Sequence, residues 1–116
     1  MSDPNCIFCK IASGAIPAKR LGENVHALAF ADLNPQAPTH VLVIPKVHLA
    51  SHAAIAPDQW PHLSAMQELA QKLAKELGLD ATGYRLVMNT GKDGGQTVFH
   101  LHLHLLGGRP MSWPPG

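Results

Sequence analysis

Three histidines, His100, His102 and His104, alternate with leucines near the C-terminal end of the chain. In a β-strand, successive side chains point to opposite faces, and neighbours on one face lie about 6.6 Å apart. The pattern therefore predicts a strand over residues 100–106, with the imidazoles on one face and the leucines toward the core. Histidine does not favour strands, and imidazole suits proton transfer, nucleophilic attack and metal binding. We therefore expect a functional surface rather than a half-buried strand that carries histidines by chance.

A single metal ion held by all three histidines is disfavoured by their spacing. Nitrogen ligands of one zinc ion lie at most about 4 Å apart, whereas same-face neighbours on a regular strand are about 6.6 Å apart. Rotamers bring two such rings together more readily than three. We expect the three histidines to divide their roles.

The two cysteines, Cys6 and Cys9, form a Cys-x-x-Cys pair near the N-terminus. This spacing is typical of metal binding or thiol redox chemistry rather than of a disulfide that joins distant segments. A thioredoxin-type pair sits between a strand and a long helix in an α/β pattern, which this chain lacks. Zinc is the better interpretation, and two thiolates need two further ligands to close a tetrahedral site.

The remaining segments predict the elements that position these side chains. Residues 58–77 have apolar side chains at helical spacing, with Asp58 as a plausible N-cap. The β-branched run over residues 39–45 predicts a central strand. The other predicted elements are a turn or two of helix in 5–11, a hairpin of strands 18–21 and 25–31 that turns at 22–24, and a strand over 84–89 paired with the histidine strand. The sequence therefore predicts an α+β fold: an antiparallel sheet of about five strands with one long helix and a short N-terminal helix.

Size and composition limit the possible functions. The chain has 116 residues, which suits one domain over residues 1–116 with one core. The net charge is +1 and the nine Lys and Arg residues form no run, so we expect no nucleic-acid partner and a compact ligand instead. The N-terminus shows no secretory signal and no stretch reaches the ~18 apolar residues of a membrane span, so we expect a cytoplasmic protein without membrane contact.

The histidine motif and its surroundings resemble a known family. His100-x-His102-x-His104, preceded by Gly94-Gly95-Gln96-Thr97, is similar to the signature of the histidine triad (HIT) family. Segments that resemble its Hint branch cover nearly the whole chain; they are Cys6-Ile7-Phe8-Cys9-Lys10-Ile11, Ile16-Pro17-Ala18, Pro35-Gln36-Ala37-Pro38-Thr39-His40, Ile44-Pro45-Lys46, Asn89 and Trp113-Pro114-Pro115-Gly116. The resemblance implies a HIT-like fold and a homodimeric enzyme that hydrolyses purine nucleoside 5′-phosphoramidates, such as AMP linked to an amine.

By position in the motif, the resemblance assigns His102 as the nucleophile that carries a covalent nucleotidyl group. It assigns His104 to contact phosphate and His40 to orient the second ring nitrogen of the nucleophile. Thr97 matches a donor near the leaving group. These roles fit the chemistry, because displacing an amine from phosphorus needs a nucleophile, donors to the charged oxygens and a proton for the leaving nitrogen.

The same matching places the nucleotide. Asp32 matches the acid that accepts hydrogen bonds from the ribose hydroxyls, and Asn89 and Gln96 are placed to help hold phosphate. The implied base pocket consists of Ile7, Phe8, Ile11, Phe30, Leu33 and Leu42. From the sequence pattern alone, each of these apolar residues would be assigned to the core.

The resemblance also completes the metal site and extends the active site to a second subunit. Cysteine-bearing HIT proteins add two histidines, here His48 and His100, to Cys6 and Cys9, which implies a structural zinc ion and no organic cofactor. Trp113 matches a tail residue that lies near the active site of the other subunit, at the entry for the leaving amine.

Two other functions stay open at this point. A dinucleoside polyphosphate hydrolase of the same family uses the same nucleophile but usually lacks the Trp-Pro-Pro-Gly tail. A nucleotide-binding module without catalysis would use the histidines only to hold phosphate. His26, His52 and His62 are interpreted as surface or incidental residues.

Overall fold

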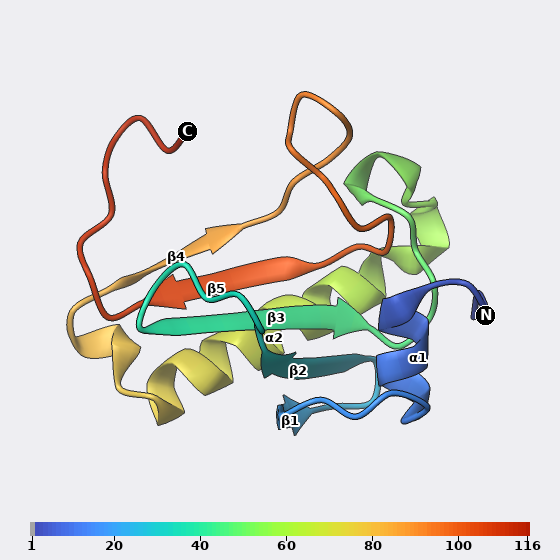
Figure 1. The fold of residues 1–116 in the computed structure, drawn as a ribbon, viewed down its shortest axis with the longest axis horizontal. Helices are drawn as coiled ribbons and strands as arrows, with labels where there is room; N and C mark the ends of the chain where they lie inside the picture. Colours follow the sequence, from blue (N-terminus) through green and yellow to red (C-terminus); the bar gives the residue numbers. More distant parts are fainter. Residues whose placement is uncertain (1) are drawn as a thin grey trace.

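The computed structural model describes residues 2–116 and contains a five-stranded sheet with two α-helices (Figure 1). Every neighbouring strand pair is antiparallel, and the order across the sheet is β1-β2-β3-β5-β4. The elements are α1 (Ile7–Ser13), β1 (Arg20–Glu23), β2 (Ala27–Ala31), β3 (Thr39–Pro45), α2 (Trp60–Glu76), β4 (Tyr84–Val87) and β5 (Leu103–Gly107), with 3-10 turns at η1 (His52–Ala54), η2 (Pro57–Gln59) and η3 (Leu79–Ala81). The predicted α+β fold is confirmed.

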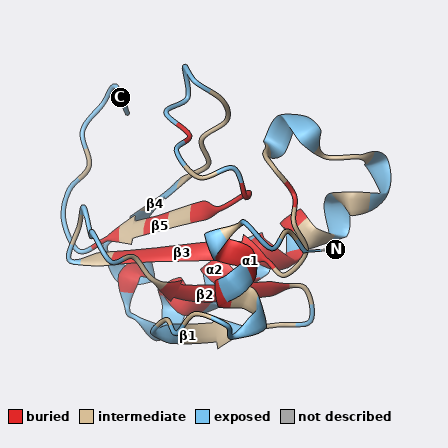
Figure 2. Ribbon diagram, turned by 45° about the vertical axis from the view of Figure 1, so that its right-hand side comes forward, coloured by how far each residue is buried: buried red, intermediate tan, exposed pale blue. Residues whose placement is uncertain are grey.

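Each face of the sheet has its own apolar cluster. The helix α2 crosses one face and packs against alternate residues of the strands, including Val41, Val43, Leu103 and Leu105. The other face carries a smaller cluster that joins α1 to the sheet through Phe8, Ile11, Leu28, Phe30, Leu42 and Ile44. Figure 2 shows that burial is concentrated in β2, β3 and β5, between these two layers. Because side chains alternate along a strand, His40 and His104 fall on the face opposite α2.

The leucine face of the histidine segment is buried as predicted, but the strand is shorter. Leu101, Leu103 and Leu105 are at most 2% exposed and belong to the cluster under α2. The strand β5 begins only at Leu103, so His100 and His102 precede the ladder. The reason is that β3 pairs no further than Val43 opposite Leu103, and the Leu101 N–H donates instead to the carbonyl of Leu49, at 2.6 Å.

The start of the long helix differs from the prediction. Asp58 lies in the turn η2 and does not cap α2, which begins at Trp60. At the start of that turn, the side chain of Gln59 folds back, and its Oε1 accepts from the Ala56 N–H at 2.8 Å. The prediction that Asp58 caps the long helix was therefore wrong, because the 3-10 turn η2 precedes α2.

Two strand boundaries also differ. Gly22 and Glu23 belong to β1, and the first hairpin turns later, at Asn24, whose Oδ1 accepts from the N–H groups of His26 and Ala27 at 3.1 and 2.8 Å. The strand β4 ends at Val87 rather than Asn89. Within residues 2–116, none of the helices combines the length and the hydropathy of a membrane span.

Candidate active site and metal centre

His102 occupies the middle of the histidine segment and has a defined tautomer. Its Nδ1 lies 2.7 Å from the carbonyl oxygen of His100. Because a carbonyl only accepts, Nδ1 must carry the proton, which leaves the lone pair on Nε2. His102 is 8% exposed, and its ring forms a T-shaped pair with the ring of Phe8, at a centroid distance of 5.2 Å. An imidazole in this state presents a nucleophilic nitrogen.

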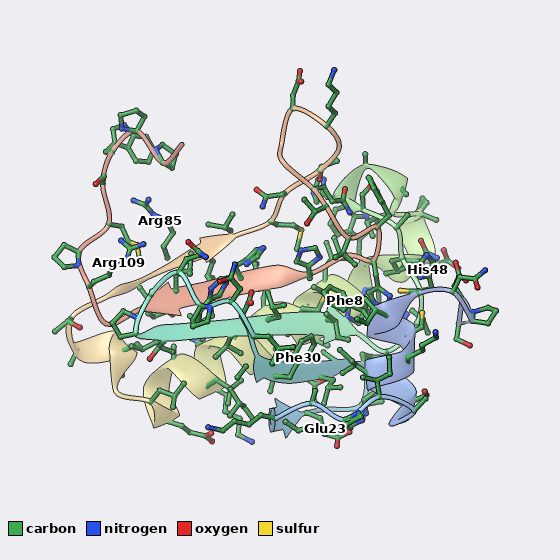
Figure 3. The ribbon with its side chains drawn as sticks, in the orientation of Figure 1. Phe8, Glu23, Phe30, His48, Arg85 and Arg109 are labelled. Carbon is green, nitrogen blue, oxygen red and sulfur yellow. The ribbon has the colours of Figure 1, made fainter. Side chains whose placement is uncertain are left out.

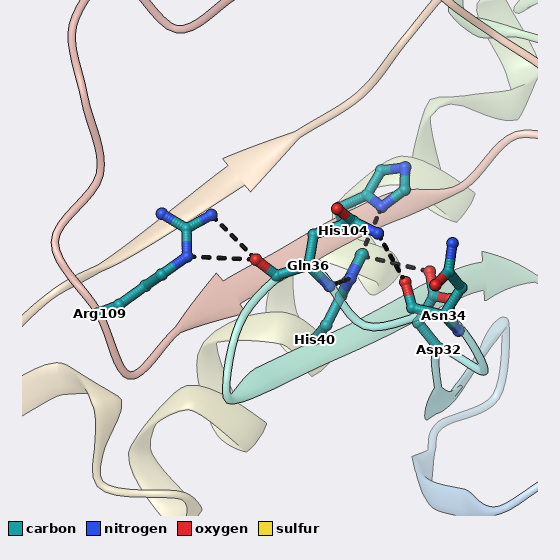
Figure 4. A network of polar contacts seen from close by, with 6 residues as sticks. All are labelled: Asp32, Asn34, Gln36, His40, His104 and Arg109. Atoms are coloured by element: carbon teal, nitrogen blue, oxygen red, sulfur yellow. Dashed lines mark hydrogen bonds and ion pairs between the residues drawn. The ribbon is translucent and has the colours of Figure 1, made fainter.

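A second chain of hydrogen bonds fixes the tautomers of His40 and His104 (Figure 4). The backbone N–H of Gln36 donates to Nδ1 of His40 at 3.0 Å, so the proton of His40 is on Nε2. That Nε2–H donates to Nδ1 of His104 at 2.9 Å. Nδ1 of His104 is therefore an acceptor, and its own proton is on Nε2. We call the series from Gln36 through His40 to His104 the histidine relay.

Burial keeps the relay uncharged near neutral pH. Burial, together with smaller effects of the neighbouring His102 and His40 rings and against an opposing effect of Asp32, lowers the pKa of His104 to about 4. Burial also lowers the pKa of His40, with Asp32 opposing again. A neutral His104 donates a hydrogen bond from Nε2 without carrying a positive charge.

The relay contradicts the expected partner of His40. The structure pairs His40 with His104, and the second ring nitrogen of His102 is held by the His100 carbonyl instead. The register explains this result: His40 lies opposite Leu106 and Leu42 lies opposite His104, so His40 is diagonal to His104. His102 lies beyond the paired part of the sheet. The predicted role of His40 as the residue that orients His102 was wrong.

Asp32 lies beside the relay at the end of β2. Its Oδ2 is 3.3 Å from Nε2 of His40, and its Oδ1 accepts from the backbone N–H of Asn34 at 2.8 Å. Asp32, His40 and His104 bring three potential metal donors within 4.8 Å of one another. However, Nδ1 of His40 accepts from Gln36, which places a proton rather than a lone pair on Nε2. The cluster is therefore a hydrogen-bond relay and not a metal site.

The four predicted metal ligands do meet in one cluster. Cys6, Cys9, His48 and His100 each offer a donor atom, and all four lie within 4.8 Å of one another. Nδ1 of His100 is 3.2 Å from Sγ of Cys6 and 3.5 Å from Sγ of Cys9, and Nδ1 of His48 is 3.4 Å from Sγ of Cys9. Tetrahedral zinc with bonds of about 2.3 Å to sulfur and 2.0 Å to nitrogen separates such atoms by about 3.5 Å. The cluster thus has the size and donor set of a zinc site.

The surroundings of this cluster prepare its donors. Nε2 of His100 lies 3.0 Å from the carbonyl of Pro45, so Nε2 carries the proton and Nδ1 faces the sulfurs with its lone pair. Backbone N–H groups of Cys9 and Asp3 donate to the sulfurs of Cys6 and Cys9, at 3.4 and 3.3 Å. Burial raises the pKa of the Cys9 thiol, so a bound cation is needed to favour its thiolate. The residues present therefore fit the metal.

The expected base pocket separates into a buried part and an exposed part. Four of its members are buried and pack together on the face opposite α2; they are Phe8, Ile11, Phe30 and Leu42. Figure 3 shows Phe8 and Phe30 on this side, near α1. Ile7 and Leu33 are 49% and 98% exposed. An apolar floor with two exposed apolar residues beside it can accept a flat ring.

Among the described residues, the side chains expected near phosphate and the leaving group form no hydrogen bond with the relay. Gln96 is buried, its Nε2 donates to the carbonyls of Ala50 and Val98, and its Oε1 accepts from the Gly91 N–H, so its side chain organises the glycine-rich loop. Thr97 is exposed and lines a hollow with Ile7 and His48. Asn89 is half-buried just after β4.

The C-terminal tail lies at the other end of the sheet from the metal cluster. Figure 3 places His48 near the N-terminal segment and places Arg85 and Arg109 at the opposite end. The Arg85 guanidinium donates to the carbonyl of Ser112 at 2.9 Å, and Trp113 is 84% exposed. Sequence reasoning missed both arginines and the backbone of Gln36. The Gly107-Gly108 turn signal was the available indication that the tail folds back there.

Comparisons with known proteins place this architecture in a family. The HIT domain family matches residues 13–111. An uncharacterized HIT-like protein of Synechocystis is 51% identical over 95% of this chain and 96% of that protein, and a 14 kDa zinc-binding protein of Zea mays is 45% identical over 100% of this chain and 91% of that protein. The chain belongs to the HIT family.

Solved structures also place the chain in the HIT family. A HIT family hydrolase from Legionella pneumophila superposes with a TM-score of 0.93 at 54% identity, covering 97% of this chain and 100% of that chain. A histidine triad protein from Clostridium difficile superposes with a TM-score of 0.94 at 46% identity, covering 97% of both chains. Together with the histidine arrangement, these matches support a hydrolase of the HIT type.

Proposed function

We propose that this chain is a purine nucleoside 5′-phosphoramidate hydrolase that works through a covalent nucleotidyl-histidine intermediate. The observation that carries the proposal is the bond from Nδ1 of His102 to the carbonyl of His100, at 2.7 Å. It leaves the lone pair of Nε2 available for attack on phosphorus. It also stabilises the positive charge that the ring acquires when Nε2 becomes bonded to phosphorus.

The reaction then has two displacements. In the first, the Nε2 lone pair of His102 forms a bond to phosphorus, the P–N bond breaks, and the leaving nitrogen keeps the bonding electron pair and takes a proton from solvent water. In the second, water attacks phosphorus and gives a proton to solvent, the bond to His102 breaks with its electron pair returning to Nε2, and a nucleoside monophosphate is released. His104 donates from Nε2 to the phosphoryl oxygens in both steps, and His40 holds it in the tautomer that allows this.

The nucleotide would be held on the same face of the sheet. Asp32 supplies carboxylate oxygens for the ribose hydroxyls, at the end of β2 beside the relay. The purine packs on Phe8, Ile11, Phe30 and Leu42, with Ile7 and Leu33 closing over it. Asn89 and the loop organised by Gln96 approach phosphate, and Thr97 assists the leaving amine.

We infer that the cluster of Cys6, Cys9, His48 and His100 binds one structural zinc ion. Four protein ligands close a tetrahedral site, and zinc would then crosslink α1 to the segment after β3 and the segment before β5. The zinc-binding maize relative supports this inference. Cysteines that bind a metal rather than form a disulfide also suit a reducing compartment, which supports a cytoplasmic location.

In a homodimer, the second subunit would add a residue to the entry of the active site. The edge strand β4 and the start of α2 expose large apolar residues, with Trp60 at 48%, Leu86 at 37% and Tyr84 at 37%. Exposed apolar side chains beside an unpaired strand edge are typical of an interface. In such a dimer, Trp113 from the partner subunit would line the entry for the leaving amine.

The test is turnover of a panel of AMP and GMP amidates by the purified protein, with bis-adenosyl polyphosphates as the competing substrates. The proposal predicts amine release from the amidates with a higher kcat/KM than for any polyphosphate. Faster cleavage of the polyphosphates would contradict it. Binding of AMP without turnover of either class would indicate a nucleotide-binding module.

A further inference from the structure

The C-terminal segment touches the histidine relay through a residue that the proposed reaction does not use. Nε and Nη2 of Arg109 both donate to the carbonyl of Gln36, at 3.2 and 3.0 Å (Figure 4). Nη1 of the same guanidinium donates to the carbonyl of Pro110 at 3.1 Å. Hydrogen bonds from a charged donor are stronger than neutral ones, and two donors on one oxygen fix its direction.

Gln36 joins this contact to the relay. Its carbonyl accepts from Arg109, and its backbone N–H donates to Nδ1 of His40. Gln36 belongs to the exposed loop between β2 and β3, and its side chain donates to the carbonyl of Asn34 at 3.1 Å. In an exposed loop of this kind, the position of one N–H depends on few contacts, so the bonds from Arg109 matter for it.

The backbone after β5 brings Arg109 to this loop. Gly108 has a φ of +90°, and a Cβ there would lie 2.9 Å from Cβ of Pro38. Only glycine allows both the left-handed conformation and the close approach to Pro38. The preceding residue, Gly107, is paired with Thr39 at the start of β3. The chain therefore turns against the loop directly before Arg109.

We propose that Arg109 is a positioning residue, which holds Gln36 so that the Gln36 N–H fixes the tautomer of His40 and, through it, that of His104. The inference rests on the proposed function, in which His104 donates from Nε2. If the Gln36 N–H moves away, His40 loses the donor that occupies Nδ1, and of the two contacts that favour a proton on Nε2 only the Asp32 carboxylate, at 3.3 Å, is left. With the proton on Nδ1, Nε2 of His40 and Nδ1 of His104 become two acceptors facing each other at 2.9 Å. His104 must then protonate Nδ1 or move, and in either case its outward donor is lost or displaced.

The test compares Arg109→Met with Arg85→Met in the full-length protein. Arg85 is the matched control, because it also donates to a tail carbonyl and also loses one positive charge, but no bond joins it to Gln36. Nitrogen-15 NMR of labelled histidines reports the tautomers of His40 and His104, and steady-state kinetics with an AMP amidate report turnover. For Arg109→Met we expect a shift of both rings away from the Nε2–H tautomer and a fall in kcat of about tenfold, with KM nearly unchanged, as for one lost supporting hydrogen bond.

Arg85→Met should keep both tautomers and kcat, and Arg109→Lys should recover part of both, since an ammonium group can donate one bond to Gln36. If Arg109→Met does not fold, the same measurements are made on Arg109→Lys. Unchanged tautomers in Arg109→Met, or equal changes in Arg85→Met, would overturn the positioning role. The NMR result does not depend on turnover, so a wild-type protein that fails to cleave amidates would contradict the proposed function and leave this inference to be decided by the tautomers alone.

Discussion

The two ends of the histidine segment use the same side chain in different ways. His100 is fully buried, its Nε2–H donates to Pro45, and its Nδ1 lone pair faces the two cysteine sulfurs. His104 is only half-buried, its Nδ1 accepts from His40, and its proton remains on Nε2. The first ring is prepared to bind a metal and the second to donate a hydrogen bond.

Burial is the main cause that lowers the pKa of both His100 and His104 to about 4. Their acidity therefore does not separate their functions. What separates their functions is which nitrogen is already bonded within the protein. In His100 a carbonyl accepts from Nε2 and leaves Nδ1 available, whereas in His104 the His40 ring donates to Nδ1 and leaves Nε2–H available. In His102, between them, the carbonyl holds Nδ1 instead, and Nε2 carries the lone pair.

The largest expected effect is at His102. His102→Ala should lower kcat/KM for an AMP amidate by roughly 10³-fold or more, because the nucleophile is lost, while AMP affinity changes little. Stopped-assay kinetics and calorimetric titration with AMP measure the two quantities. Near-normal turnover would contradict the assignment, and simultaneous loss of AMP binding and of cooperative unfolding would indicate a folding defect.

At the metal end, the effect should be on stability. Elemental analysis of the wild-type protein should find about one zinc per chain, and Cys6→Ser combined with Cys9→Ser should remove it. A domain with its own core depends on zinc less than a small finger does, so we expect a loss of about 3 kcal/mol, or roughly 10 to 20 °C in Tm. His100→Ala should lower Tm more than His102→Ala does. Metal-free wild-type protein, purified without chelator, would argue against the site.

Asp32 should affect binding rather than chemistry. Asp32→Ala should raise KM by about tenfold with a smaller change in kcat, because ribose contacts are similar in the ground and transition states. Asp32→Asn is the matched variant, since its amide oxygen can still accept from the Asn34 N–H. A fall in kcat alone, with KM unchanged, would show that Asp32 acts through His40 instead.

The smallest expected effect is the pH dependence of stability. The pKa of His104 is lowered by burial to about 4 in the folded state, against about 6.5 for a free imidazole. Between these values the unfolded chain binds more protons, so stability falls as the pH is lowered from about 6.5 to about 4. Urea unfolding should show a shallower fall for His104→Gln, by under about 1 kcal/mol per pH unit because the ring is partly exposed. Equal slopes would mean that His104 is not shielded in the folded state.

Much of the fold could be predicted because even short strands show a regular alternation of apolar residues in the sequence. The alternation of histidine and leucine predicted the buried face of β5, and the run over residues 39–45 predicted β3 with its boundaries. Element ends were less predictable. The start of α2 depends on a 3-10 turn closed by Gln59, and the start of β5 depends on a bond from Leu101 to a distant carbonyl. Neither contact leaves a local signal in the sequence.

The site could be predicted as a set of residues but not as a set of bonds. The four predicted metal ligands do come together from three distant segments: the Cys-x-x-Cys spacing indicated the two cysteines, and only the family resemblance added His48 and His100. The partner of His40 was predicted wrongly, because the diagonal position depends on the register between β3 and β5. The contributions of Gln36 and Arg109 come from a backbone N–H and a backbone carbonyl, which residue identity does not reveal; the Gly107-Gly108 turn signal indicated only that the chain folds back there.

The central claim is that Nε2 of His102 attacks phosphorus, and trapping the intermediate tests it most directly. Wild-type protein is mixed with an AMP amidate, quenched without acid within the first turnovers, and digested for mass spectrometry. The account predicts an adenylyl group on the peptide that contains residues 100–104, mapped to His102 and absent in His102→Ala. Steady amine release by wild-type protein with no adduct at any quench time, or an adduct on His104 or His40, would contradict it.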